Sequence, residues 1–161
     1  MGIPNSNVHP PRGFTRILWR LPIWLYRANL GWLLTEHFLL LYHVGRKSGQ
    51  VRQVVVEVVM RDKADDVYYI AAGFGPSSDW YQNLLKTPQA RIQSGFRKVD
   101  VTAEIMSVEK AERVILDYAR RYPAAIRMLA RILGYEVGKG EEDYRGFARV
   151  VPIVALKVIR R

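Results

Sequence analysis

The sequence predicts an α+β protein whose main feature is a small mixed-topology β-barrel. Three strand-like runs, Phe38–Val44, 53–61 and 67–72, follow one another with no helix between them. This order excludes a doubly wound parallel sheet, in which a helix follows each strand. The runs are almost continuously apolar, and strands of that kind are buried on both faces, as in a closed or nearly closed barrel.

Alternating side chains predict the inward face of two strands and bring the expected total to about six. Residues 97–106 are expected to point four apolar side chains inward, Val99, Val101, Ala103 and Ile105. In residues 53–61 one face is predicted to carry Val54, Val56, Val58 and Met60. Two further strands are expected at 90–94 and 153–159.

Helices are predicted in the segments that separate these strands. Ser77 or Ser78 is expected to cap a short helix, because a serine hydroxyl can accept from the first free amides of a helix. Longer helices are predicted at 107–122 and 124–133. Residues 134–147 are rich in glycine and charge and predict a loop.

The length of 161 residues is typical of a single domain, predicted to span residues 1–161. The absence of cysteine excludes disulfides, thiolate metal sites and a cysteine nucleophile. The three histidines lack metal-site spacing, so no metal site is predicted. A net charge of +10 and a pI near 10.1 favour anionic partners. The sequence contains no run of eighteen apolar residues, so no transmembrane helix is predicted.

The N-terminal region predicts two parts ahead of a barrel core at residues 38–161. Residues 1–12 contain three prolines among polar residues and predict a loose arm. Residues 13–34 predict an amphipathic helical segment, kinked by its proline, with tryptophans and leucines around an arginine face. Such a helix packs on its own domain, forms a homodimer contact, or lies at a membrane interface. All three interpretations remain open.

The turn at residues 44–52 carries more positive charge than a hairpin needs. It combines Gly45 and Gly49 with Arg46, Lys47 and Arg52, and Ser48 adds a hydroxyl. A turn needs glycine for positive φ, but three cations are an addition that suits a phosphate or carboxylate. An ordinary solvated turn fits the local pattern equally well.

A second motif raises the weight of the anion-site interpretation. Gly45-Arg46-Lys47-Ser48-Gly49, with Arg52, Ala71-Ala72-Gly73 and Trp80-Tyr81-Gln82-Asn83-Leu84, resembles the deazaflavin-dependent nitroreductase and quinone reductase family. The resemblance extends from about residue 39 to residue 106. It implies a split β-barrel of the FMN-binding type, with about six mostly antiparallel strands, flanking helices and coenzyme F-420, an 8-hydroxy-5-deazaflavin.

The resemblance also implies residue roles. The phosphate and oligoglutamate tail of the coenzyme would be held by Arg46, Lys47, Ser48 and Arg52. The flat ring system would approach Ala71, Ala72, Gly73 and Phe74. The helix that closes the ring pocket would supply Trp80, Tyr81, Asn83 and Leu84, although core packing explains Trp80 and Leu84 equally well. The acceptor side would be lined by tyrosines, best matched by Tyr122, with Tyr135 and Tyr144 as further candidates.

The implied function is transfer of a hydride from reduced F-420 to a small hydrophobic acceptor, such as a quinone or a nitro compound. The implied location is the cytoplasm, with peripheral contact at the inner face of the membrane through residues 13–34. FMN, or another flavin or tetrapyrrole, is the alternative ligand of such a barrel. An alternative of another class is a non-catalytic basic module for anionic lipid or nucleic acid. No pattern for specific nucleic-acid recognition is present.

Overall fold

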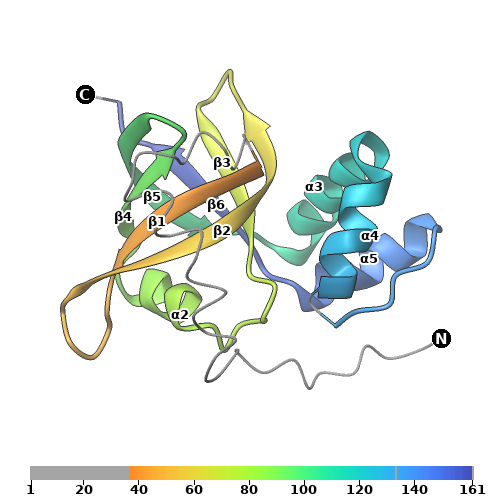
Figure 1. The fold of residues 1–161 in the computed structure, drawn as a ribbon, viewed down its shortest axis with the longest axis horizontal. Helices are drawn as coiled ribbons and strands as arrows, with labels where there is room; N and C mark the ends of the chain where they lie inside the picture. Colours follow the sequence, from red (N-terminus) through yellow and green to blue (C-terminus); the bar gives the residue numbers. More distant parts are fainter. Residues whose placement is uncertain (1–36, 133, 161) are drawn as a thin grey trace.

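The computed structural model describes residues 37–132 and 134–160, and in this part of the chain six strands close into a barrel (Figure 1). The strand order around the barrel is β1-β2-β3-β6-β5-β4, and every neighbouring pair is antiparallel. The strands are β1 (Phe38–Val44), β2 (Val51–Asp62), β3 (Val67–Ala71), β4 (Gln89–Ser94), β5 (Arg97–Ile105) and β6 (Ile153–Val158). This arrangement confirms the predicted barrel and its antiparallel character.

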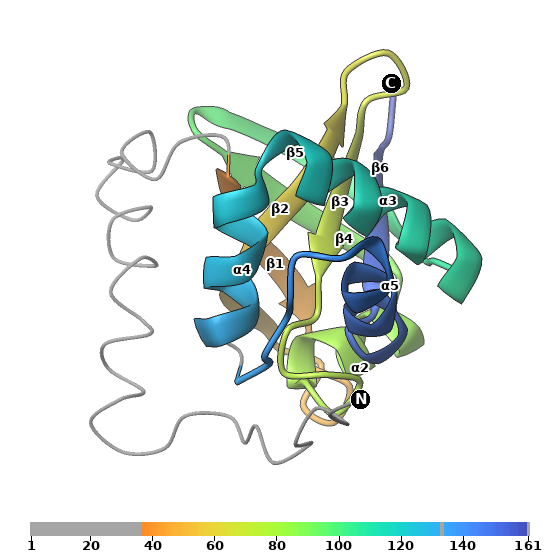
Figure 2. The same ribbon diagram turned by 90° about the vertical axis from the view of Figure 1, so that its right-hand side faces the viewer.

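Four described helices occupy two different positions around the barrel (Figures 1 and 2). The short helix α2 (Asp79–Lys86) lies across one end. A layer on one side of the barrel consists of α3 (Val108–Arg121), α4 (Pro123–Ile132) and α5 (Glu141–Val150). No helix among the described residues is long and apolar enough to cross a membrane.

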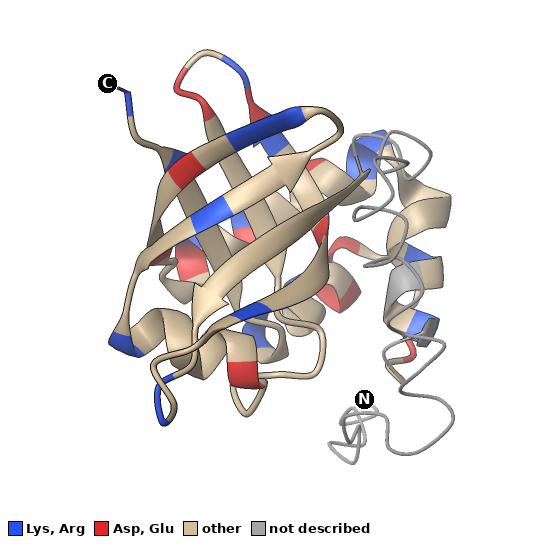
Figure 3. Cartoon of the chain, turned by 60° about the vertical axis from the view of Figure 1, so that its left-hand side comes forward, with Lys and Arg blue, Asp and Glu red and all other residues tan. Residues whose placement is uncertain are grey.

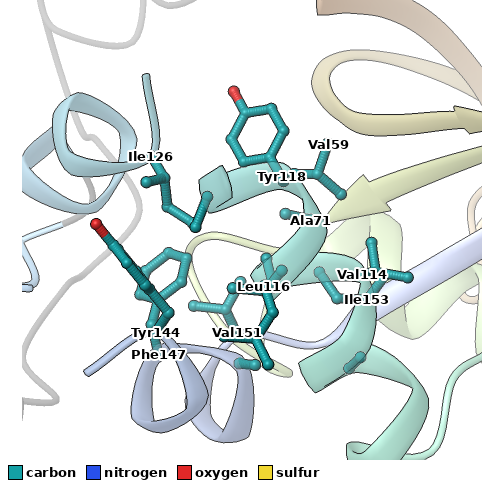
Figure 4. Packing of buried hydrophobic residues seen from close by; sticks show 14 of the residues in the cluster. Val59, Ala71, Val114, Leu116, Tyr118, Ile126, Tyr144, Phe147, Val151 and Ile153 are labelled. Atoms are coloured by element: carbon teal, nitrogen blue, oxygen red, sulfur yellow. The ribbon is translucent and has the colours of Figure 1, made fainter. Parts of the chain in front are cut away.

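Two buried clusters follow from this arrangement. The barrel interior is filled from several strands by side chains such as Leu39, Val58, Ile70, Ile92 and Leu156. The second cluster lies between the barrel wall and the helical layer, as Figure 4 shows. It joins Val59, Ala71 and Ile153 of the wall to a set of helix residues that includes Val114, Ile115, Tyr118, Ile126 and Phe147. Strands β2, β3 and β6 are therefore covered on both faces, as their apolar runs predicted.

A β-bulge in β2 corrects one predicted face. The register passes from Val58 opposite Ile70 directly to Met60 opposite Tyr69, so Val59 is an extra residue. Val54, Val56 and Val58 face the barrel interior as predicted. The prediction that Met60 shares this face was wrong, since the bulge turns Met60 outward with Tyr69 against the helical cluster.

The prediction that residues 134–147 form only a loop was also wrong, because they include most of α5. The low helix propensity of Gly140 and Gly146 hid this helix. Gly140 is in fact the N-cap, and the Asp143 carboxylate accepts a hydrogen bond of 3.1 Å from its backbone amide. An acidic first turn also suits the positive end of the helix dipole.

The capping hydrogen bond predicted at α2 is absent, whereas a serine that was not predicted as a cap accepts from the first turn of α3. The Ser107 hydroxyl accepts from the Lys110 amide at the start of α3. Ser78 occupies the N-cap of α2, but its hydroxyl donates to the Gly75 carbonyl oxygen at 2.9 Å instead of accepting from the helix. The predicted arm (1–12) and amphipathic segment (13–34) lie outside the described residues, so the division of the chain remains a prediction.

The carboxylate of Glu112 ties α5 to α3. It accepts from Arg145 at 3.2 Å and from Arg149 at 3.0 Å, and its side chain is 14% exposed. We expect Glu112→Ala to lower the free energy of unfolding by about 1–3 kcal/mol, since it leaves two cations without their shared acceptor. Urea denaturation checks this value.

The matched control is Asp117→Ala on the same helix, which removes a more exposed pair with Arg121. Its cost should stay below about 1 kcal/mol. Equal losses in both variants would show that Glu112 does not hold the two helices together.

Candidate cofactor-binding site

The β1–β2 turn is folded tightly on itself. The Gly45 amide donates to the Gln50 carbonyl oxygen and the Gly49 amide donates to the Gly45 carbonyl oxygen, both at 2.8 Å. Gly49 has a φ of 68°, a conformation that favours glycine. A Cβ at Gly45 would lie 2.7 Å from Ser48 Oγ and 3.2 Å from Arg52 Nε, so a larger residue there would displace these two side chains. The turn thus brings a hydroxyl and a guanidinium together over a backbone without a side chain.

The side chain of Asn83 joins this turn to α2. Asn83 Oδ1 accepts from the backbone amide and from Nη1 of Arg46, both at 3.0 Å. The same Nη1 forms an ion pair of 3.0 Å with Asp79 Oδ1. Lys86 Nζ donates to the Arg46 carbonyl oxygen at 2.9 Å. The two sequence motifs are therefore adjacent, and Arg46 is the residue that attaches one to the other.

His43 completes this attachment from inside the barrel. It is 4% exposed, and its Nδ1 lies 3.0 Å from Asn83 Nδ2. Because the amide nitrogen can only donate, His43 Nδ1 accepts and the imidazole is neutral. Burial lowers the pKa of His43 to about 4, helped by Arg52 and opposed by Asp79. No special role was predicted for His43 from the sequence, although it lies on the same face of β1 as the inward Leu39 and Leu41.

The remaining cations of the turn have no ion-pair partner among the described residues. Lys47 and Arg52 are exposed, and neither forms a salt bridge there. In contrast, carboxylates elsewhere in this part of the chain pair with many arginines, among them Arg61, Arg91, Arg97, Arg145 and Arg149. Figure 3 shows this interspersed charge over the barrel. The turn is thus a place where positive charge remains available to an anion.

The small-residue segment after β3 connects the barrel to α2. Ala71 and Ala72 are buried, and Gly73 and Phe74 are half-buried. The Ala72 amide donates to the Pro152 carbonyl oxygen at 2.8 Å. Gly75 has a φ of 77°, which turns the chain towards α2. The segment is therefore held by backbone bonds and offers a wall with little side-chain bulk.

The aromatic residues of α2 lie inside the barrel end. Trp80, Tyr81 and Leu84 are 8%, 7% and 2% exposed and belong to the barrel-interior cluster. The rings of Trp80 and Tyr81 meet edge to face, with centroids 6.1 Å apart. These side chains support the site from behind. Their predicted contact with a flavin-like ring is a proposal.

Of the three predicted acceptor-side tyrosines, one is exposed and two are buried. Tyr122 follows α3 and is 46% exposed, with its ring edge-on to His37 at 5.6 Å. Tyr135 and Tyr144 are 9% and 8% exposed and belong to the helical cluster, where Tyr135 packs on Phe147. Tyr122 is therefore the accessible member of the predicted set.

Sequence reasoning did not assign a role to Glu57, which lies beneath α3. The Tyr118 hydroxyl donates to Glu57 Oε1 at 2.9 Å. Burial raises the pKa of Glu57 to about 6, although the Tyr118 hydrogen bond acts in the opposite direction. A single carboxyl within the apolar run Val54–Met60 was the available signal.

The class of protein defined by this fold is a split-barrel protein, and the β1–β2 turn is its candidate anion site. The family model for F420H(2)-dependent quinone reductase matches residues 18–128, which is more than half of the chain. The chain therefore belongs to that family. The predictions of an oxidoreductase and of coenzyme F-420 as its cofactor are confirmed. The family match favours F-420 over FMN and a catalytic role over a basic binding module.

Solved structures with low sequence identity share the fold. An F420-H2 dependent reductase (FDR-A) is 22% identical with a TM-score of 0.52, covering 75% of this chain and 94% of its own. A chain described as a domain-swapped dimer is 19% identical with a TM-score of 0.51, covering 84% and 99%. A general stress protein 26 relative from Clostridium acetobutylicum, of the pyridoxinephosphate oxidase family, is 10% identical with a TM-score of 0.51, covering 85% and 84%. No curated protein matches the chain.

Removal of the Asn83 amide should release the turn from α2. Asn83→Leu leaves the Arg46 amide and the His43 acceptor without their partner, so we expect the free energy of unfolding to fall by about 2–4 kcal/mol. Urea denaturation measures the loss. Leu85→Ala, at a half-exposed position of the same helix, is the control and should cost far less. A small loss in Asn83→Leu would show that the turn does not depend on this amide.

The neutral state of His43 predicts acid sensitivity. Its folded pKa of about 4 lies below its ordinary value of 6.5, so the folded state binds fewer protons between these values. The contribution of neutral His43 to stability should be complete above pH 6.5 and should fall as the pH decreases towards 4, by at most about 3 kcal/mol. The free energy of unfolding of the wild type relative to His43→Gln, measured at a series of pH values, should show this decrease. A difference that does not change with pH would assign the effect to other groups.

Proposed function

We propose that the chain reduces a quinone with reduced F-420, and that the β1–β2 turn holds the phosphate and oligoglutamate tail of the coenzyme. The observation that carries this proposal is the approach of Ser48 Oγ and Arg52 Nε to Gly45, with exposed Lys47 in the same turn. The turn thus combines a hydroxyl with two cations that form no salt bridge among the described residues, which together fit a phosphate. The anionic tail would account for charge that the barrel itself does not neutralise.

The ring system would lie against the wall formed by Ala71, Ala72, Gly73 and Phe74. Small side chains allow a flat ring to approach closely, and the backbone bonds of this segment keep it in place. Asn83 would act by fixing the turn relative to α2, with Trp80, Tyr81 and Leu84 supporting the wall from within. Arg46 would contribute mainly through this attachment, because Asp79 and Asn83 already engage it.

When bound, the reduced deazaflavin supplies a hydride from ring carbon 5. The protein's contribution is to orient the two reactants and to exclude water between them. Tyr122 would line the acceptor side, where its half-exposed ring can contact a hydrophobic quinone. Tyr135 and Tyr144 remain candidates that would need the helical layer to open. An activated nitro compound is a second acceptor of the same chemistry.

A lipid-soluble quinone gives residues 13–34 a role. We propose peripheral contact of this segment with the inner face of the membrane from a cytoplasmic protein, and we retain a homodimer as the assembly. Liposome binding by the full chain and by a variant lacking residues 1–34 would test the first proposal. Equal binding would refute membrane contact through this segment.

The tail site predicts a specific loss of affinity. The double variant Lys47→Ala and Arg52→Ala removes two charged contacts, so we expect F-420 to bind about a hundredfold or more weakly, at about 1.5–3 kcal/mol for each contact. Fluorescence titration of the coenzyme measures the affinity. Wild-type affinity should also fall with rising salt, since the contacts are exposed.

The matched control is the double variant Lys63→Ala and Lys139→Ala, which replaces two exposed cations outside the turn. It has the same net charge as the test variant. It should bind the coenzyme nearly as the wild type does. Equal weakening in both variants would indicate a general charge effect and would displace the tail from the β1–β2 turn.

A further inference from the structure

Glu57 occupies an unusual place in the barrel wall. Its neighbours Val56 and Val58 point into the barrel, so Glu57 points outward towards the helical layer. It pairs with Phe38 on β1, and the register of Val58 opposite Ile70 sets Glu57 level with Ala71 on β3. Ala71 is the first residue of the proposed ring wall. A carboxyl beside apolar neighbours therefore lies next to the proposed ring wall.

Helix α3 supplies the groups that face this carboxyl. Tyr118 donates to it at 2.9 Å, and the Tyr122 ring lies 5.5 Å from the Tyr118 ring. The ring of His37 packs nearly perpendicular to the ring of Tyr122. Beside Glu57 on the neighbouring strands lie the apolar Phe38 and Ala71. Figure 4 shows Tyr118 in this place, next to Val59 and Ala71. No cation among the described residues forms a salt bridge with Glu57.

The chemistry of the proposed reaction needs a proton as well as a hydride. A quinone that accepts a hydride gains two electrons and one hydrogen, and it becomes a quinolate until its remaining oxygen is protonated. A half-buried carboxyl whose pKa is raised to about 6 is suited to supply that proton. An exposed carboxylate with a lysine partner is not.

We propose that the Glu57 carboxyl protonates the quinone during its reduction, with Tyr118 as the positioning residue. This inference rests on the proposed quinone reduction. The Glu57 O–H bond breaks and an O–H bond forms on the quinone, while the hydride and its two electrons come from reduced F-420, which is oxidised. Glu57 is left as a carboxylate that accepts the Tyr118 hydrogen bond, and a proton from solvent restores it.

The protonation state of Glu57 can be measured without turnover. The folded pKa of about 6 lies above the ordinary 4.5, so the folded state binds more protons between these values. The contribution of Glu57 to stability should therefore decrease as the pH rises from 4.5 to 6, where it opposes the contribution of His43. The free energy of unfolding of the wild type relative to Glu57→Gln should fall over this range. Infrared spectroscopy of the wild type should show a protonated carboxyl band that titrates away around pH 6 and is absent from Glu57→Gln.

Tyr118→Phe should shift the titration of Glu57, which a purely structural role of Tyr118 would not predict. Since the Tyr118 hydrogen bond favours the carboxylate, its removal should move the infrared titration of Glu57 to higher pH. The same variant should shift the pH profile of kcat in the same direction. An unchanged titration would overturn the positioning role of Tyr118.

The kinetic test compares Glu57→Gln with Glu104→Gln, which alters an exposed carboxylate paired with Lys157 on the barrel wall. We expect Glu57→Gln to lower kcat about a hundredfold while F-420 affinity stays within twofold. Glu57→Asp should restore part of the rate, and Glu104→Gln should act as the wild type. Wild-type kcat in Glu57→Gln would overturn this inference alone. A wild-type protein that does not bind F-420 would instead overturn the proposed function.

Discussion

The site depends on one buried amide, the side chain of Asn83. Its two ends cannot be exchanged, because the oxygen must accept from Arg46 and the nitrogen must donate to His43. This requirement fixes the turn, α2 and the end of β1 relative to one another and keeps the imidazole neutral. Since Asn83 is 2% exposed, any of these bonds left unmade would be costly. The position of the turn is thus set from inside the barrel.

Because of this attachment, the cations of the turn have different roles. Arg46 is engaged by Asp79 and Asn83 and serves the architecture, whereas Lys47 and Arg52 have no salt-bridge partner in the described part of the chain. In sequence the three looked equivalent. Charge that stays unpaired beside a network of paired arginines is better placed to attract an anion than the overall excess of +10, which is spread along the chain.

Patterns of side chains predicted the barrel well but not its irregularities. Alternation located the strands because each is buried on one or both faces, and it failed at Val59 because a bulge depends on how β2 pairs with β3. Helix α5 was not predicted because Gly140 and Gly146 lower the local helix propensity. Part of its stability comes from hydrogen bonds to Glu112 of α3, a helix that is distant in sequence but adjacent in space. The two motifs predicted a joint site. The role of Asn83 as their connection could not be read from spacing, since it needs the three-dimensional contact with Arg46.

A balance of burial and hydrogen bonding explains how a carboxyl can stay in the barrel wall. Glu57 is half-buried beside Phe38 and beneath α3, where an ionised carboxylate is less well solvated than in water. One hydroxyl from α3 is enough to satisfy an oxygen but not enough to hold a full charge, so the balance between the two protonation states lies closer to neutrality than in water. The helical layer that completes the second buried cluster therefore also influences the pKa of Glu57. A cation in place of Tyr118 would hold Glu57 ionised and leave it unable to give up a proton.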